Sequence, residues 1–475
     1  MRFEKATPES QGISSSAILD FLNKVNKQGF ELHSFMLLKN GKNIADCWWK
    51  PYAPQYRHQL FSLSKSFTSI AIGLAVKEGL VTTDTLIADI FEVEMKELGE
   101  KVDEKIKKMT VKNLLTMGTG MTYENWVWND ENSNNVLGFL SSHVKNEPGS
   151  AFFYNTLGTY MCSAIITRLT GQKLVDYLMP RLFEPLGIDP IWEEDKLGIN
   201  YGGFGLNIKT EDIAVFGQML LQKGNFNGVQ LVPEAWIEEA SSKQMNNGDE
   251  ADSDWAQGYG YQFWRCVPDG VYRGDGMYGQ YCIVIPDHNC VIAVTSNVDM
   301  GKFMKLIWSD LLPWVGGETA LLQNSDYNKL VEFETSQTHL QVNENAQPYP
   351  TFRASYRLTK DAVVEDEFKI NKIDFDFENG ECLLALYNEE SSQPLYVVRF
   401  IQKKWVETAK QFWTSESYYR AVCYGEWNDE ELTACIWHYE TPLNTKLKFT
   451  FSEERKILVL HVEAQKELTL SYVKI

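Results

Sequence analysis

A serine and a lysine three residues apart, at the start of an apolar segment, are the first candidates for chemistry in this chain. Ser62 and Lys65 open a run that continues to Val76, and no charged residue follows Lys65 within it. Residues at i and i+3 lie on one face of a helix, so the hydroxyl and the ammonium can meet. Such a helix is buried on most sides, and burial lowers the pKa of an amine. The pattern predicts Ser62 as a nucleophile and Lys65 as its base.

The same spacing of serine and lysine occurs at two other places, which limits what the pattern shows by itself. Ser142 and Lys145 lie among polar residues, where nothing would desolvate the lysine. Ser471 and Lys474 lie in a predicted strand, whose geometry sends side chains three apart to opposite faces. For Ser62 and Lys65, the simpler alternative is a helix-capping serine followed by a surface lysine.

The composition is that of a globular protein with more than one core. The chain has 475 residues, more than a usual single domain, and 44% of them are hydrophobic. Its formal net charge of −19 argues against nucleic acid or an anionic membrane surface as a partner. The first residues lack the apolar core of a signal peptide, and the longest apolar run, around 70–76, is too short to span a bilayer. We therefore expect no membrane insertion.

The eight cysteines are scattered and form no Cys-x-x-Cys pair. Cys435 and His438 come closest to a metal motif, but they lie in an alternating segment whose strand geometry would point them to opposite faces. No cluster of histidines and acids has ligand spacing, so a metal-dependent hydrolase is set aside. Reduced, buried thiols suit a cytoplasmic protein, and the sequence predicts no metal and no cofactor.

The first two thirds of the chain predict one antiparallel sheet interrupted by a long helical part. His33–Lys39 and Asn43–Trp49 flank Asn40-Gly41, a strong hairpin signal. Three strands follow much later, and they complete the sheet only if early and late segments pair across the helical insert. These strands are Gly258–Cys266, Tyr281–Pro286 and Cys290–Ser296. The predicted helices are Ser16–Lys27, the Ser62 helix, Val111–Met117, Tyr160–Leu169, Asp176–Phe183, Thr210–Gln222 and Phe303–Leu312.

The last third of the chain has a different texture, with about eight short alternating strands at regular spacing. This pattern predicts a separate all-β domain, a lipocalin-like barrel or a sandwich, over residues 319–475. The preceding domain covers residues 1–318, and the polar stretch Gln323–Lys329 is the predicted linker. The aromatic residues of these strands, Tyr418, Tyr419, Trp427 and Trp437, form no concentrated chemical group.

Seven segments, in order and at similar spacing over residues 8–316, resemble the serine β-lactamase-like hydrolases. That group includes class C β-lactamases, penicillin-binding DD-peptidases, β-lactamase-fold carboxylesterases and aminohexanoate-oligomer hydrolases. The resemblance implies an α/β (α+β) fold of the β-lactamase/transpeptidase type, with an antiparallel sheet flanked by helices. The matching segments are Phe61–Phe67, Leu114–Met117, Glu147–Gly149, Phe153–Thr156, Leu182–Ile188, Gly202–Leu206 and Gly274–Tyr281.

The resemblance also implies roles for individual residues. Ser62 would be the nucleophile, Lys65 its base, and Tyr154 a second general base and acid from the family's Y-x-N motif. A nearby ammonium stabilises a phenolate, so we treat Lys65 and Tyr154 as a coupled pair. The oxyanion hole would consist of the backbone N–H groups of Ser62 and Met277.

Two departures from the family pattern bear on substrate choice. Thr156 replaces the asparagine of Y-x-N, and Gly274-Asp275-Gly276 replaces K-T-G or H-x-G, so an acid stands beside the place of the missing cation. A carboxylate substrate would meet Asp275 at a like-charge cost. Arg273 is one residue from the place of the missing cation, and on a strand we expect it to face the opposite side. Thr156 and residues 274–276 are the predicted substrate contacts, and the shift is towards neutral or cationic esters and amides.

The sequence thus predicts a serine hydrolase that acts through an acyl-enzyme on a small ester or amide, like a carboxylesterase or amidase, with weak β-lactamase or DD-peptidase activity left open. The alternative is a non-catalytic binding or sensor protein of the same fold, favoured by the missing cation. Tyr154 could also be a core residue, Asp275 a solvated turn acid, and the glycines a bulge. Trp126, Trp128 and Trp264 either line the pocket or pack in the core. A homo-oligomer is compatible with this interpretation.

Overall fold

The computed structural model describes residues 2–127, 134–316, 326–358, 370–388, 393–394, 396–408, 420–451, 456–463 and 466–474. Its contacts divide the chain into two compact units. The first unit comprises Met1–Trp48 and Pro54–Gln337, and the second comprises Trp49–Ala53 and Thr338–Ile475. The division thus follows Gln337, later than the predicted 318/319 boundary. Part of the predicted linker forms helix α14 (Tyr327–Ser336), and residues 323–325 lie outside the described residues.

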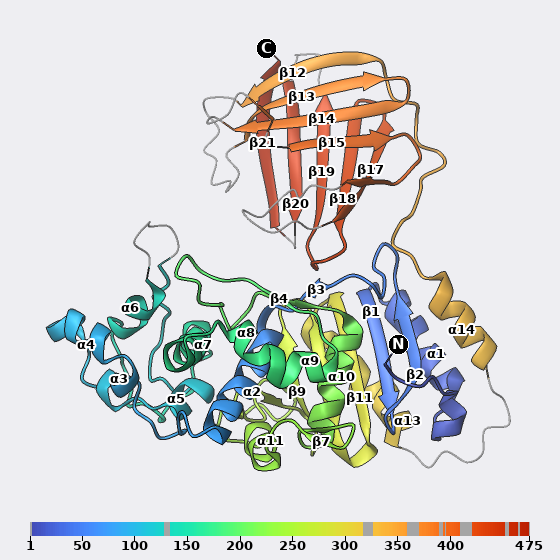
Figure 1. Ribbon diagram of the computed structural model, residues 1–475. Helices are drawn as coiled ribbons and strands as arrows, with labels where there is room; N and C mark the ends of the chain where they lie inside the picture. Colours follow the sequence, from blue (N-terminus) through green and yellow to red (C-terminus); the bar gives the residue numbers. More distant parts are fainter. Residues whose placement is uncertain are drawn as a thin grey trace. The chain divides into compact units, whose positions relative to one another are not determined.

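The first unit is built around a six-stranded antiparallel sheet (Figure 1). Strand β1 pairs with β11 from Glu31↔Asn297 to Lys39↔Cys290, which confirms that early and late segments share one sheet. The strand predicted over Gly258–Cys266 is wrong for most of its length, because Gln262 takes a φ of +67° that interrupts extended backbone. The strand order is β2 (Lys42–Trp48), β1 (Glu31–Lys39), β11 (Cys290–Asn297), β10 (Gln280–Ile285), β9 (Tyr272–Gly276) and β8 (Trp264–Arg265).

Helices cover both faces of this sheet. On one face α10 approaches so closely that a Cβ on Gly217 would lie 2.5 Å from Val291 of β11. On the other face Phe21 of α1 packs its ring on Phe35 of β1 and on Phe303 of α12. The helices are α1 (Ser15–Lys27), α2 (Ser64–Lys77), α3 (Ile87–Ile90), α4 (Glu92–Leu98), α5 (Val111–Leu115), α6 (Asn135–Leu140), α7 (Thr156–Thr170), α8 (Leu174–Leu178), α9 (Glu184–Leu186), α10 (Thr210–Leu221), α11 (Glu234–Ser241), α12 (Met300–Leu306), α13 (Leu312–Gly316) and α14.

Helix α2 lies at the centre of the helical part and is buried from Ser64 to Ala75, as its lack of charge predicted. The Phe67 ring stacks on Phe216 of α10 at 3.8 Å between centroids. A 3₁₀ turn, Phe61–Leu63, precedes the helix. Two small sheets complete the unit: β3 (His58–Gln59) with β5 (Leu206–Ile208) and β4 (Ile191–Trp192), and β6 (Asn225–Phe226) with β7 (Val229–Gln230).

The second unit is a ten-stranded antiparallel sheet, which confirms the all-β prediction for this region. Figure 1 shows β12–β15 crossing the strands β17–β21. A Cβ on Gly425 of β17 would lie 2.9 Å from Phe400 of β15, so the sheet curls until its two ends meet. Strands β12 and β16 were not predicted, and Tyr418 and Tyr419 lie outside the described residues. The order is β15 (Tyr396–Ile401), β14 (Glu381–Asn388), β13 (Ile370–Glu378), β12 (Phe352–Leu358), β21 (Lys466–Lys474), β20 (Lys456–Glu463), β19 (Asn444–Phe451), β18 (Glu431–His438), β17 (Ala421–Asn428) and β16 (Val406–Thr408).

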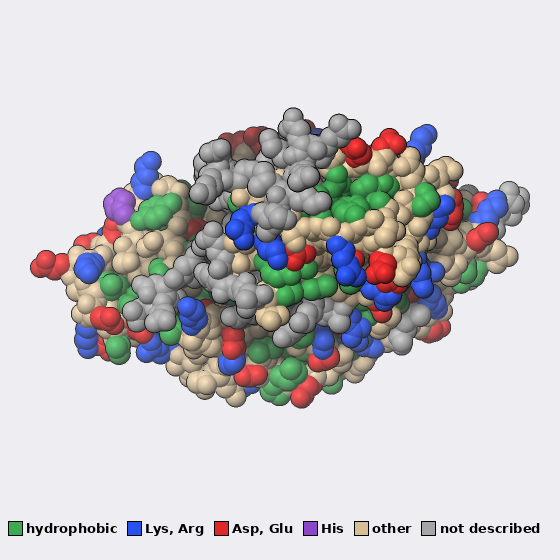
Figure 2. All heavy atoms as spheres, turned by 90° about the horizontal axis from the view of Figure 1, so that it is seen from above, with side chains coloured by type: hydrophobic (Ala, Val, Ile, Leu, Met, Phe, Trp, Pro, Cys, Tyr) green, Lys and Arg blue, Asp and Glu red, His purple; other side chains and the backbone are tan. Residues whose placement is uncertain are grey.

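The surface carries charges of both signs. On the face shown in Figure 2, acidic and basic side chains are interspersed, so the net charge of −19 is not gathered into one acidic patch there. Within the described ranges, none of the helices has the length and apolar character that crossing a bilayer requires.

Candidate active site

Ser62 and Lys65 meet where helix α2 begins. The Lys65 Nζ atom lies 3.0 Å from Ser62 Oγ, as the spacing of the two residues predicted. Ser62 is half-buried in the 3₁₀ turn, just after Phe61, whose φ of +47° is uncommon for an aromatic residue. The Ser64 hydroxyl donates to the Phe61 carbonyl at 2.6 Å and closes this turn. The serine is therefore presented by a strained turn that its neighbours hold in place.

The amine of Lys65 is sealed inside the protein. The side chain is 1% exposed, and Nζ also donates to the Gly203 carbonyl at 2.8 Å and to Thr156 Oγ1 at 3.3 Å. Burial lowers the pKa of Lys65 to about 7, although the charges of Glu124 and Asp275 act to raise it. Close to half of these amines are thus neutral near pH 7.

Tyr154 completes the group. Lys65 Nζ lies 4.9 Å from the centre of the Tyr154 ring, the phenol hydroxyl is hydrogen-bonded to Ser62, and the ring stacks on Trp264 at 5.3 Å. Burial raises the pKa of Tyr154 above its ordinary value, Asp275 adds to the rise, and the bond to Ser62 opposes it. Burial thus outweighs the phenolate stabilisation that we expected from the neighbouring ammonium, and the phenol keeps its proton at neutral pH.

The amino end of α7 fixes Thr156 and brings Glu124 into the site. Helix α7 begins at Thr156, four residues before the predicted start, because the Asn155 side chain caps it by accepting from the Gly158 N–H at 2.7 Å. Glu124 accepts hydrogen bonds from the Thr156 N–H and, at 3.3 Å, from the Leu157 N–H. The Asn155 side chain, the amide of the altered Y-x-N motif, is thus occupied in capping α7.

The polar loop that begins at Thr122 forms part of the wall around the site. Trp126 Nε1 donates to Glu124 Oε2 at 2.7 Å, and the Trp126 ring meets Tyr201 and Phe204. Glu124 was not among the residues predicted from the sequence. Trp128, which was predicted, lies outside the described residues.

Strand β9 passes the Ser62 turn at very close range. A Cβ on Gly274 would lie 2.4 Å from Ser66 Oγ, and a Cβ on Gly276 would lie 2.0 Å from the Leu60 carbonyl oxygen. Only glycine fits at either position. Met277 follows at the turn into β10, with its side chain exposed. Its backbone N–H stays a predicted oxyanion donor.

Asp275 is paired with Arg273, which corrects our expectation for the arginine. Residues two apart on a strand share a face, and Arg273 Nε donates to Asp275 Oδ2 at 2.9 Å. The arginine is fully buried, and its guanidinium lies 4.9 Å from the Trp255 ring centre and 5.8 Å from that of Trp264. Burial raises the pKa of the Asp275 carboxyl, while Arg273 and a hydrogen bond from Trp264 oppose the rise. Gly274 still leaves the motif without its cation, and the neighbouring Arg273 is already paired with Asp275.

A buried glutamine, not predicted, ties the elements of the site together. The backbone carbonyl of Gln262 accepts a hydrogen bond from Ser66 Oγ at 2.9 Å, and its side-chain Oε1 accepts one from Thr159 Oγ1 at 2.7 Å. Its amide donates to the Leu115 carbonyl at 2.8 Å. It thereby joins α2, α7 and α5. A lone glutamine carries no sequence signal for such a position.

Known proteins match this chain over its first unit, and some solved structures match nearly all of it. The model of the family described as "Beta-lactamase" matches residues 21–309. The 6-aminohexanoate-dimer hydrolase of Paenarthrobacter ureafaciens is 23% identical over 324 residues, which cover 62% of this chain and 81% of the relative. The structure of a penicillin-binding protein homologue from Caulobacter crescentus has a TM-score of 0.51 at 17% identity and covers 62% of this chain and 95% of its own. The structure of SurE with D-Leu has a TM-score of 0.52 at 16% identity and covers 97% of this chain and 99% of its own.

Proposed function

Since the chain belongs to the beta-lactamase family, with its antiparallel sheet and flanking helices, we propose that it is a serine hydrolase that works through an acyl-enzyme. Ser62 is the nucleophile, Lys65 the base and Tyr154 the proton donor to the leaving group. The substrate is a small ester or amide.

The observation that carries the proposal is the set of partners around the Lys65 amine. A neutral amine has two N–H donors and one lone pair. The Gly203 carbonyl and Thr156 Oγ1 accept hydrogen bonds from Nζ, so both N–H donors are occupied when the amine is neutral. The lone pair then faces Ser62 Oγ at 3.0 Å, and it can take the serine proton.

The reaction that follows from these positions has two steps. Ser62 Oγ bonds to the substrate carbonyl carbon as its proton passes to Lys65, and the backbone N–H groups of Ser62 and Met277 bind the oxyanion. Tyr154 then gives its proton to the leaving alcohol or amine as the scissile bond breaks, and it regains a proton from Lys65. Water repeats the sequence on the acyl-enzyme and releases the acid.

The charges around the site favour substrates without a carboxylate. Arg273 is fully buried and paired with Asp275, so the pair has no net charge and offers no free cation to an anionic group. We therefore propose neutral or cationic esters and amides, with weak turnover of β-lactams or peptide carboxylates. The name of the Paenarthrobacter relative, a hydrolase of a dimer of an amino acid, supports amide substrates.

The site of action that we propose is the cytoplasm. All eight cysteines are unpaired, and seven of them are buried. Such thiols persist in a reducing compartment.

The test is a stopped-flow assay with p-nitrophenyl acetate and butyrate on the wild type, Ser62→Ala and a matched control, Ser142→Ala. Ser142 belongs to the second serine–lysine pair, and its buried hydroxyl donates to the Gly138 carbonyl at 2.9 Å. We expect a stoichiometric burst of p-nitrophenol from the wild type and from Ser142→Ala, and none from Ser62→Ala. If Ser62→Ala keeps the burst, Ser62 is not the nucleophile. If the wild type gives no burst, a binding or sensor protein becomes the better interpretation of the fold.

A further inference from the structure

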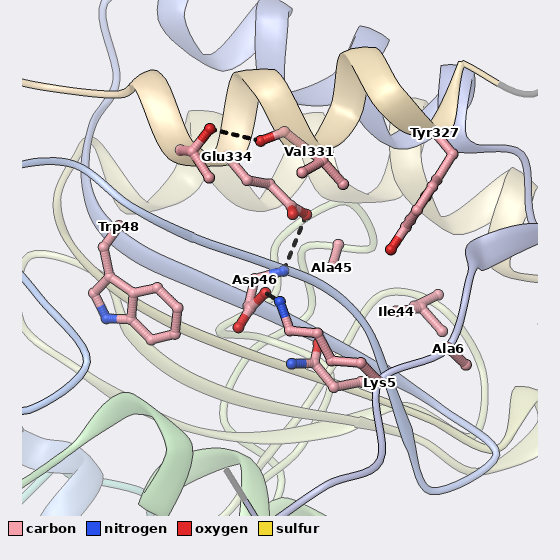
Figure 3. A pocket seen from close by; sticks show the side chains of 11 residues that line it. Lys5, Ala6, Ile44, Ala45, Asp46, Trp48, Tyr327, Val331 and Glu334 are labelled. Atoms are coloured by element: carbon pink, nitrogen blue, oxygen red, sulfur yellow. Dashed lines mark hydrogen bonds and ion pairs between the residues drawn. The ribbon is translucent and has the colours of Figure 1, made fainter.

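A pocket of about 270 Å³ opens at the edge of the sheet formed by β2, within the first unit. Three segments supply its walls: the amino-terminal residues Lys5 and Ala6, strand β2, and helix α14 (Figure 3). Strand β2 is the edge strand, so its outward N–H and carbonyl groups need partners. The Asn43 N–H donates to the Glu4 carbonyl at 3.0 Å, and the Asp46 N–H donates to Glu334 Oε1 at 3.1 Å. The pocket lies between the amino-terminal segment and helix α14, which supply these two hydrogen-bond acceptors.

Three charged side chains converge on this pocket, and two of them are acids. Lys5 Nζ pairs with Asp46 Oδ1 at 2.5 Å, and the Asp46 side chain is 4% exposed. Figure 3 shows Glu334 pointing from α14 toward this pair. When Glu334 is ionised, one lysine faces two carboxylates, so the group has a net charge of −1. The pocket is short of one positive charge.

The surroundings of Glu334 favour its protonated carboxyl form unless a cation lies beside it. Burial, with the charge of Asp46 next, raises the pKa of Glu334 to about 8, while Lys5 and the Asp46 N–H act to lower it. From the other elements packed on α14, the Cys47 thiol donates to the Glu334 backbone carbonyl at 3.6 Å, and Asn26 of α1 donates to Gln337 at 2.8 Å. The charges that act on the carboxyl are those of Lys5 and Asp46.

The remaining walls suit a small apolar body rather than a metal ion. Trp48, Ala45, Tyr327 and Val331 line the pocket beside the charges. Aromatic rings and short aliphatic side chains accept a hydrocarbon chain, and an aromatic face also attracts an ammonium. Among the described residues, no three or more His, Cys, Asp or Glu side chains are grouped to hold a metal ion. The volume lies just below the usual range for drug-sized ligands, so the occupant is smaller.

We propose that this pocket binds a small organic cation, a primary ammonium on a short apolar body, with Glu334 as its counter-ion. The cation takes the place of the Glu334 proton, so one proton is released for each ligand bound. The site lies at the opposite edge of the sheet from β9 and does not depend on the function proposed for Ser62.

The probe is n-butylammonium chloride, titrated into the full chain by isothermal titration calorimetry, with n-butanol and sodium butyrate as the neutral and anionic analogues. We expect binding of the ammonium alone, about tenfold tighter at pH 9 than at pH 7, because Glu334 ionises between them. Repeating the titration in buffers of different ionisation enthalpy at pH 7 gives the released proton.

The variants are Glu334→Gln, Val331→Phe and a control on the same helix, Glu332→Gln, whose side chain is exposed. Glu334→Gln can still accept from the Asp46 N–H, and we expect it to bind at least tenfold more weakly and without pH dependence. Val331→Phe, which fills the pocket, should lose binding as well, and Glu332→Gln should bind like the wild type. The proposal is overturned if no ammonium binding occurs, if butyrate or butanol binds as well as butylammonium, or if Glu334→Gln binds like Glu332→Gln.

Discussion

Near each end of the six-stranded sheet lies a lysine with acids around it, Lys65 of α2 beside β9 and Lys5 beside β2, and the pKa values of the two lysines shift in opposite directions. Beside β9, burial lowers the pKa of Lys65 to about 7, because Glu124 and Asp275 act only as charges at a distance. Beside β2, burial is also the largest single effect on Lys5, yet its pKa is raised, because Asp46 is in contact with it. Lys65 is 1% exposed, whereas the Lys5 side chain is 49% exposed, so burial opposes the charged form of Lys5 less, and the contact with Asp46 outweighs that burial. The difference makes one lysine a base and the other a structural cation.

The largest expected effect on activity comes from replacing these two lysines with methionine, one at a time. Lys65→Met should lower kcat/KM for p-nitrophenyl butyrate by about 10²–10⁴-fold, because a positioned general base contributes on that order. Lys5→Met, at the far edge, should change it by less than about twofold. Steady-state kinetics on both variants, with circular dichroism to confirm folding, decides the matter. Equal losses would mean that the chemistry does not depend on the buried amine.

The next effect follows from the protonation of Lys65 itself. Only the neutral amine can take the serine proton, and it forms as the pH rises through about 7. We therefore expect kcat/KM to rise about tenfold per pH unit below pH 7 and to level off above it. A profile from pH 5 to pH 9 with p-nitrophenyl butyrate measures this. A flat profile, or a rate that falls across this range, would remove Lys65 as the base.

A smaller effect concerns the paired cation beside Asp275. Asp275→Asn leaves the buried Arg273 cation without its partner, so the site gains one positive charge that can attract a carboxylate. The ratio of kcat/KM for mono-p-nitrophenyl succinate to that for p-nitrophenyl butyrate should rise by about tenfold, the equivalent of one charge contact. The ratio is used because an unpaired buried arginine also costs stability. An unchanged ratio would show that Asp275 does not set the charge preference.

The parts of the site that the sequence could predict are those governed by local geometry. Ser62 and Lys65 meet because i, i+3 neighbours share a helix face, and the uncharged run after Lys65 indicates the burial that lowers its pKa. The same kind of local rule should have placed Arg273, since residues two apart on a strand share a face. We did not apply that rule to positions 273 and 275, and the structure shows the two side chains paired on one face.

The parts that the sequence could not predict depend on residues far apart in the chain. Glu124 caps a helix that starts 32 residues later, and Gln262 bonds to Thr159, 103 residues before it. Neither residue type is unusual in its local context. The first turn of α14 was assigned to the linker, and the rest of the helix was not predicted, because α14 is polar and buries only Leu330, so its helical pattern is weak. Propensity and periodicity identify elements with an apolar face, and tertiary contacts decide the rest.

The smallest expected effect sharpens the comparison by removing a distant acid from the buried lysine. The charge of Glu124 acts to raise the pKa of Lys65, so Glu124→Gln should move the midpoint of the pH–rate profile below about 7. The glutamine oxygen can still accept from the Thr156 and Leu157 N–H groups, so the cap of α7 is retained. The measurement is the midpoint of kcat/KM against pH, with the exposed Glu104→Gln as a control that should leave it unchanged. A midpoint that stays in place in Glu124→Gln would mean that solvent screens this acid from Lys65, and that burial by itself sets the pKa of the base.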